Sequence, residues 1–226
     1  YDTETNNIAI GHVALGGSVN GGEYNIAIGN TSLDALTSAD YVTAVGNNAG
    51  TAITTGGKHV LIGHNAGSGL TTSSGSCVYI GTGAGSGSNN DTETGNIGIG
   101  EDTMGGAGNT INGAEYNVAI GYVALDALTS GDHNVAIGYE AGTDMTTAGQ
   151  NVLIGSAAGP NLTTGATQRT IMIGYAAGFT PTTETNNIGI GALAVGGTGT
   201  VNGGEYNVGI GITSLTDLTS GDENTC

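Results

Sequence analysis

The sequence predicts an all-β fold, a parallel β-solenoid of about 12 coils with 17–21 residues in each coil. Three observations predict it: a five-residue pattern that recurs along the whole chain, a glycine that closes each copy, and a shortage of large side chains. The pattern is clearest at 134–138, which read Asn-Val-Ala-Ile-Gly. We number the first position of each copy as zero and count forward from it.

Each copy of the pattern predicts one short strand. Position +1 is β-branched in every copy and position +3 is always Ile or Val, and residues two apart on a strand point to the same side. We therefore expect position +3 to form a core ladder inside the solenoid. Its members are Ile10, Ile28, Val45, Ile62, Ile80, Ile99, Ile120, Ile137, Ile154, Ile173, Ile190 and Ile210.

The residue at +4 predicts the turn that ends each strand. It is glycine in every one of these copies, which indicates a backbone conformation that other residues avoid. The turn glycines are Gly11, Gly29, Gly46, Gly63, Gly81, Gly100, Gly121, Gly138, Gly155, Gly174, Gly191 and Gly211.

Composition indicates a thin core built by stacking. The 226 residues include 45 Gly, one Phe and no Trp, so side chains that could fill a wide core are missing. A single coil cannot bury its own strand, and neighbouring coils must pile up to make a core. The steady Ile/Val pattern argues against disorder, and the lack of a Gly-X-Y period argues against collagen.

We interpret residues 1–226 as a single solenoid fibre segment with a second, longer period. Near-copies of a Thr-Glu-Thr stretch define a five-coil super-repeat, with units 2–90 and 91–181 and a partial unit 182–226. Because the sequence starts and stops inside a repeat, we expect a fragment of a longer chain.

The first coil of each super-repeat carries a loop of variable length that ends in Glu-Tyr. Length variation at one place in a solenoid indicates an exposed loop on one face, where recognition can occur. The candidate recognition loops end at Tyr24, Tyr116 and Tyr206. The alternative is that these tyrosines only cover the glycine-rich loops.

Position +2 is predicted to point away from +1 and +3, and so outward, as a strip that another chain would cover. Its members include Ala9, Ala27, Leu61, Tyr79, Ala119, Leu153 and Met172. Position +7 is small throughout, and +8 is Gly in many coils. This suits either a narrow interior or the close approach of partner chains.

Charge excludes several function classes. Two basic residues stand against 19 acidic ones, a formal net charge of −17, which repels nucleic acid phosphates and anionic lipid headgroups. No run of 18 apolar residues is present, so we predict no membrane insertion. Cys77 and Cys226 lie in distant coils and are predicted not to form a disulfide.

Catalytic and metal sites are not predicted. Equivalent carboxylates such as Glu23 and Glu115 lie five coils apart, roughly 24 Å at about 4.8 Å per coil, too far for a paired-carboxylate site. His59 and His64 flank a strand and its turn without forming a zinc motif. We predict no enzyme and no cofactor, with weak Ca²⁺ binding at the acidic turns as the one exception.

The copies at 25–29, 117–121 and 134–138, each followed by a small residue at +7, resemble the head repeats of trimeric autotransporter adhesins of the YadA type. The same pattern followed by Leu-Thr-Thr/Ser-Gly is similar to head-type repeats in bacteriophage tail fibres. The resemblance implies a left-handed parallel β-roll, three chains side by side, and an adhesive or spacer role. The longer coils, the super-repeat and the absence of a stalk, neck or membrane anchor from this sequence favour a phage fibre.

We therefore expect a structural, receptor-binding fibre segment: a homotrimer outside the cell that contacts a host cell-surface receptor or glycan, on a virion as a tail fibre. The alternative within this class is a trimeric autotransporter adhesin head on a bacterial cell surface. An ice-binding β-solenoid belongs to a different class and stays open, because rows of Thr on flat β faces can order water. A glycan-cleaving tailspike is the third reading.

Overall fold

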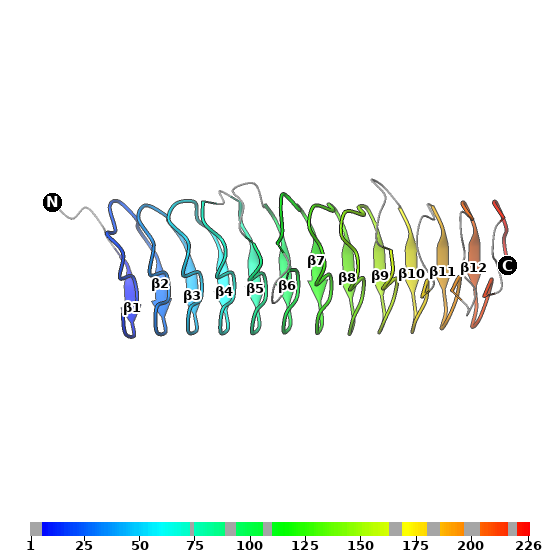
Figure 1. The fold of residues 1–226 in the computed structure, drawn as a ribbon, viewed down its shortest axis with the longest axis horizontal. Helices are drawn as coiled ribbons and strands as arrows, with labels where there is room; N and C mark the ends of the chain where they lie inside the picture. The colour runs from blue at the N-terminus through cyan, green and yellow to red at the C-terminus, as the bar shows by residue number, and fades with distance from the viewer. Residues whose placement is uncertain are drawn as a thin grey trace. The chain divides into compact units, whose positions relative to one another are not determined.

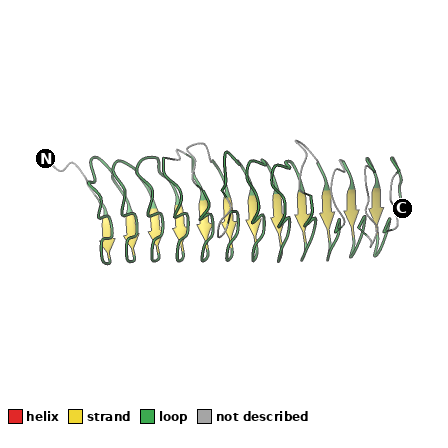
Figure 2. Cartoon of the chain, viewed as in Figure 1, coloured by secondary structure: helices red, strands yellow, loops and turns green. Residues whose placement is uncertain are grey.

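The computed structural model describes residues 6–72, 75–88, 94–105, 110–162, 169–179, 186–196, 204–216 and 221–226. Across these residues the chain is all-β, a solenoid of short parallel strands joined by turns, and it contains no helix (Figure 2). None of these residues belongs to a helix that could span a membrane. The prediction of an all-β parallel solenoid is confirmed.

The chain divides into two compact units, Tyr1–Tyr116 and Asn117–Cys226, which we call unit 1 and unit 2. Every strand has three residues and occupies positions +1 to +3. The strands of unit 1 are β1 (Ile8–Ile10), β2 (Ile26–Ile28), β3 (Thr43–Val45), β4 (Val60–Ile62), β5 (Val78–Ile80) and β6 (Ile97–Ile99). Those of unit 2 are β7 (Val118–Ile120), β8 (Val135–Ile137), β9 (Val152–Ile154), β10 (Ile171–Ile173), β11 (Ile188–Ile190) and β12 (Val208–Ile210).

Within each unit, consecutive strands pair in parallel with equivalent positions opposite one another (Figure 1). Ile28 of β2, for example, pairs with Val45 of β3. Parallel pairing needs a return path between strands, and the rest of each coil supplies it. Equivalent residues therefore form rows that run from coil to coil.

The predicted direction of the strands is wrong. In β2 to β12 position +2 is the buried one: Ala27 and Leu61 are 0% exposed, whereas Ile62 is 39% and Ile99 36% exposed. The whole predicted core ladder lies on the outward side and is half-buried or exposed. This applies to Ile10, Ile28, Val45, Ile62, Ile80, Ile99, Ile120, Ile137, Ile154, Ile173, Ile190 and Ile210.

The reason for this orientation is the residue at position zero. Buried asparagines at zero bond to the next coil: the Asn134 amide N–H donates to Asn117 Oδ1 (2.8 Å), and Asn151 N–H donates to Asn134 Oδ1 (3.0 Å). Because side chains two apart on a strand share a side, an inward zero position requires an inward +2. Positions +1 and +3 must then face out.

The interior is narrow and is filled by size complementarity between +2 and +8. Where +2 is large, +8 is glycine: a Cβ added at Gly67 would lie 2.6 Å from Leu61 Cδ2, and one at Gly85 would lie 2.4 Å from Tyr79 Cδ2. Where +2 is Ala, as at Ala27, +8 can be a buried Leu. The small residues therefore make room inside the coil, the first of the two roles that the sequence left open.

The glycines at +4 form the turn at the end of each strand. All twelve have φ between 135° and 144°, which L-residues rarely adopt. A Cβ at Gly138 would also lie 2.4 Å from the carbonyl oxygen of Gly155 in the next coil. The turn thus needs glycine for both its dihedral angle and its close backbone approach.

Candidate functional site

Positions +1 and +3 make an aliphatic strip on the outward face of each unit, which we call the outward strip. In β2 to β12 its residues are half-buried or exposed on either side of a buried +2 residue. All are Ile or Val apart from Thr43. Contiguous exposed apolar surface of this kind marks an interaction site.

In each unit a second row, at position −1, borders this strip, and we call it the edge row of that unit. Nearly all non-glycine members of the two edge rows adopt left-handed φ angles of 47° to 63°. These left-handed members are Asn6, Tyr24, Tyr41, Lys58, Tyr116, His133, Gln150, Arg169, Asn186, Tyr206 and Glu223. The two rows contain both basic residues of the chain, Lys58 and Arg169, and all but Asn186 of these members are exposed.

The three tyrosines named from the sequence, Tyr24, Tyr116 and Tyr206, all lie in the edge rows and are exposed. Each directly precedes the buried asparagine at zero. Parts of the second and third variable loops, 106–109 and 197–203, lie outside the described residues. Tyr24 lies one coil before Tyr41, and their rings stack with centroids 5.2 Å apart and planes 1° apart.

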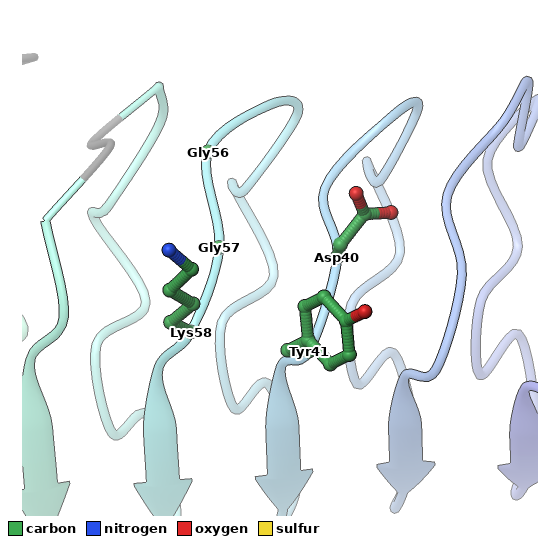
Figure 3. Close-up of a pocket in the computed structure, with 5 residues that line it drawn as sticks. All are labelled: Asp40, Tyr41, Gly56, Gly57 and Lys58. Carbon is green, nitrogen blue, oxygen red and sulfur yellow. The ribbon is translucent and has the colours of Figure 1, made fainter.

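A shallow hollow of about 230 Å³ opens beside this stack in unit 1 (Figure 3). Its lining residues are Asp40, Tyr41, Gly56, Gly57 and Lys58, from two neighbouring coils. The backbones of these coils are joined, because Lys58 N–H donates to the carbonyl oxygen of Asp40 (2.9 Å). Tyr41 and Lys58 lie two residues before the first residues of β3 and β4, so the hollow belongs to the edge row of unit 1 (Figure 3).

Unit 2 carries a further aromatic row at position +5. Tyr122 and Tyr139 stack with centroids 5.5 Å apart, and Tyr175, two coils beyond Tyr139, is 64% exposed. The pKa of Tyr139 is raised from its usual value, chiefly because its hydroxyl hydrogen-bonds to the Glu140 carboxylate. Exposed tyrosine rings therefore follow β7, β8 and β10 at the turn end of the strand.

Two aspartates at the turns accept hydrogen bonds from backbone N–H groups of the preceding coil. Asp40 Oδ1 accepts a hydrogen bond from the Glu23 N–H (2.8 Å), and Asp222 Oδ1 accepts one from the Glu205 N–H (2.9 Å). These two contacts are equivalent in the first and third super-repeats. Weak Ca²⁺ binding at acidic turns stays a prediction.

The histidines flanking β4 lie apart. His59 is buried at position zero, where its Nδ1 accepts the Cys77 N–H (3.2 Å) in place of an asparagine oxygen, whereas His64 is exposed. Over the described part of the chain, no three His, Cys, Asp or Glu side chains come together as metal ligands. Neither Cys77 nor Cys226 is in a disulfide.

The threonines that directly follow buried Leu36, Ile53 and Leu128 bond to the neighbouring coil. Thr37 Oγ1 donates to the Thr54 carbonyl oxygen (2.7 Å), Thr54 Oγ1 to that of Thr71 (3.2 Å), and Thr129 Oγ1 to that of Thr146 (2.9 Å). Hydroxyls committed to backbone carbonyls are less available to order water. This weighs against the ice-binding alternative.

Sequence reasoning missed that Tyr41 and Lys58 in unit 1 and Arg169 in unit 2 all occupy position −1. The signal was present, because aligning all copies on position zero puts both cations and four tyrosines in the −1 column. It was missed because the pattern was read forward from zero.

The comparisons with known proteins assign no family: no family model matches the chain, and no curated protein or solved structure matches it significantly.

Proposed function

We propose that the protein is a non-enzymatic structural fibre segment whose copies associate side by side through the outward strip. The observation that carries the proposal is the row of half-buried and exposed Ile and Val at +1 and +3 in both units. In the single chain this apolar surface faces water. Covering it would yield hydrophobic free energy of about 25 cal/mol for each Å² of apolar surface buried.

A second copy is the partner that fits best. The strip repeats with the spacing of parallel strands, about 4.8 Å, and only a partner with the same period can match every coil. Another copy of this chain has that period by construction. The assembly number, three, follows from the resemblance to the YadA-type head repeats. This proposal replaces position +2 as the contact surface by positions +1 and +3.

The edge row and the +5 row border the proposed contact and suit its rim. Interfaces between protein chains commonly have an apolar centre and a rim that is polar and aromatic. Tyr41, Lys58 and Tyr139 have this character and remain partly accessible beside the strip. We propose that these rows contact a host receptor or glycan outside the cell, on a phage tail fibre or, as the alternative, a bacterial adhesin head.

The test compares one substitution in the strip with one outside it in the same coil. Ile28→Glu places a carboxylate in the proposed contact, whereas Ser38→Glu adds the same charge at an exposed position on the returning part of the coil. We expect wild type and Ser38→Glu to sediment as trimers, and Ile28→Glu to associate at least about 100-fold more weakly, because a charge would have to be buried unpaired. Wild type that sediments as a monomer at high salt and micromolar concentration would rule out the assembly.

Location is tested separately. An antibody raised against the chain, used for immunogold electron microscopy of the source culture, should label fibres on virus particles. Label on the bacterial surface would support the adhesin alternative. Label confined to the cell interior would contradict both.

A further inference from the structure

We propose that the hollow between Tyr41 and Lys58 binds a neutral saccharide, with one pyranose ring lying against the Tyr41 ring. This rests on the proposed receptor-binding function and identifies a site and a ligand class for it. Four features carry the inference: an aromatic face, an open floor, and, among the described residues, a cation that has no carboxylate partner and a carboxylate oxygen that has no donor.

The first feature is the ring of Tyr41. Tyr24, one coil earlier, stacks on one face of it, yet Tyr41 is still 56% exposed. The ring lies beside the coil of Lys58, and residues of both coils line the hollow (Figure 3). A ring held by stacking on one side is already oriented, so a ligand ring that continues the stack pays little ordering entropy.

The second feature is the floor, which Gly56 and Gly57 line. Gly56 has φ 87°, and a Cβ added at Gly57 would lie 2.1 Å from the carbonyl oxygen of Asp40. Both residues are glycines because the backbone requires them. Neither residue carries a side chain into the hollow beside the aromatic ring.

The third and fourth features are polar. Lys58 is exposed and forms no ion pair or side-chain hydrogen bond with any described residue. Asp40 Oδ1 accepts the Glu23 N–H, and its Oδ2 has no donor among the described residues. The hollow therefore offers three ammonium donors and one carboxylate acceptor around an aromatic face.

A neutral pyranose matches this set. Its C–H face packs on a tyrosine ring, one hydroxyl can donate to Asp40 Oδ2, and another can accept from Lys58 Nζ. An anionic sugar or a phosphate would meet Asp40, the nearby Glu23 and a chain of net charge −17. A purely aromatic ligand would leave both charged groups unmatched. The hollow is also small, below the usual range of about 300–1,000 Å³ for drug-sized ligands, which suits a single sugar ring.

Binding of a single sugar ring in one hollow is weak, and an assembly would present several such hollows to one receptor. A homotrimer would present three copies of the hollow, and simultaneous engagement raises avidity by about 10² to 10⁴ without any new contact. The measurement on single sugars must therefore detect weak binding.

The test uses saturation-transfer NMR on the full chain. The neutral ligands are the methyl pyranosides of glucose, galactose, mannose and N-acetylglucosamine, and glucuronate is the anionic sugar with which they are compared. The variants are Tyr41→Ala, which removes the aromatic face; Lys58→Met, which removes the cation; and Asp40→Asn, which keeps the Oδ1 acceptor for Glu23 but turns Oδ2 into a donor. Phe179→Ala is the control, an exposed aromatic residue of unit 2 that lies in neither the edge row nor the +5 row.

We expect at least one neutral glycoside to receive saturation from wild type and from Phe179→Ala. The signal should vanish with Tyr41→Ala and the affinity should fall about tenfold with Lys58→Met or Asp40→Asn, in line with the loss of a charge-assisted hydrogen bond. The proposal is overturned if no neutral glycoside binds, if glucuronate binds best, or if Tyr41→Ala binds like wild type. Those results would leave the assembly tested with Ile28→Glu untouched, so the two failures can be told apart.

Discussion

At the scale of single residues, the asparagine at position zero links each coil to the next and sets the direction of the strand. Asn25 Nδ2 donates to the Ala39 carbonyl oxygen (2.8 Å), and its Oδ1 accepts the N–H of buried Val42 (2.9 Å). Inside a core these backbone groups have no water to replace a lost partner, so the amide fixes both coils.

Asn25→Ala tests this role. It leaves the Val42 N–H and the Ala39 carbonyl without partners, and we expect a loss of about 2–4 kcal/mol in the free energy of unfolding. Asn30→Ala is the control in the same coil, because Asn30 is exposed and its side chain bonds to no described residue; its effect should stay within about 0.5 kcal/mol. Urea unfolding followed by circular dichroism measures both. Equal losses in the free energy of unfolding for the two variants would mean that the asparagine at position zero contributes no more to stability than an exposed asparagine.

The turn glycines allow their two requirements to be separated. Gly191 and Gly211 have the same φ of 135°, but an added Cβ meets the Gly211 carbonyl oxygen at 2.3 Å in the first case and no atom within 4 Å in the second. Alanine at either position would have a strained φ angle, and only Gly191→Ala would also place its Cβ in a steric clash. We expect Gly191→Ala to be the more destabilising by about 1–3 kcal/mol. If the urea midpoints of the two variants coincide, the dihedral angle alone explains why glycine is used.

At the scale of the strand, the sequence was sufficient to place β1 to β12 at +1 to +3 and to predict their parallel stacking. It was not sufficient to choose the inward face, because both faces are apolar. Hydrophobicity favoured Ile28 and Ile137 over Ala27 and Ala136 as core residues, yet a narrow coil admits small side chains more easily. The hydrogen bonds of the zero position decide between the faces, and those become apparent only when neighbouring coils are stacked.

The hollow could not be predicted from the sequence, also because it depends on how neighbouring coils stack. Tyr41 and Lys58 lie 17 positions apart, and only the register between β3 and β4 makes them neighbours. Register could be inferred from the pattern, but the left-handed backbone at the −1 position could not, since non-glycine residues in proteins rarely adopt that conformation.

The orientation of the strands is tested by Leu61→Ala against Ile62→Ala, two neighbours on β4. Leu61 is 0% exposed and fills the coil opposite Gly67, so its truncation should cost about 2–5 kcal/mol. Ile62 is half-exposed, and its truncation in the single chain should cost about 1 kcal/mol or less. Making both changes in the Ile28→Glu background keeps copies apart while stability is measured. A larger loss of stability for Ile62→Ala than for Leu61→Ala would show that position +3, and not +2, faces the interior.

At the scale of the whole molecule, charge opposes the association that the outward strip favours. The two basic residues cannot neutralise 19 acidic ones, and three copies brought together would concentrate three times the net charge of −17. Apolar burial acts only at contact, whereas repulsion between like charges acts over a Debye length, about 10 Å at 0.1 M salt. Association should therefore depend on ionic strength in a direction fixed by this imbalance.

We expect sedimentation equilibrium to show tighter association as NaCl rises from about 0.02 M to about 0.5 M, because the Debye length falls from about 20 Å to about 4 Å. Ser38→Lys and Ser38→Glu change the charge by one unit each way at a site outside the strip. Ser38→Lys should associate more tightly than wild type at low salt and depend less on NaCl, and Ser38→Glu should do the opposite. Association that weakens with added salt would show instead that ion pairs between copies hold the assembly, and the outward strip would lose its role as the main contact.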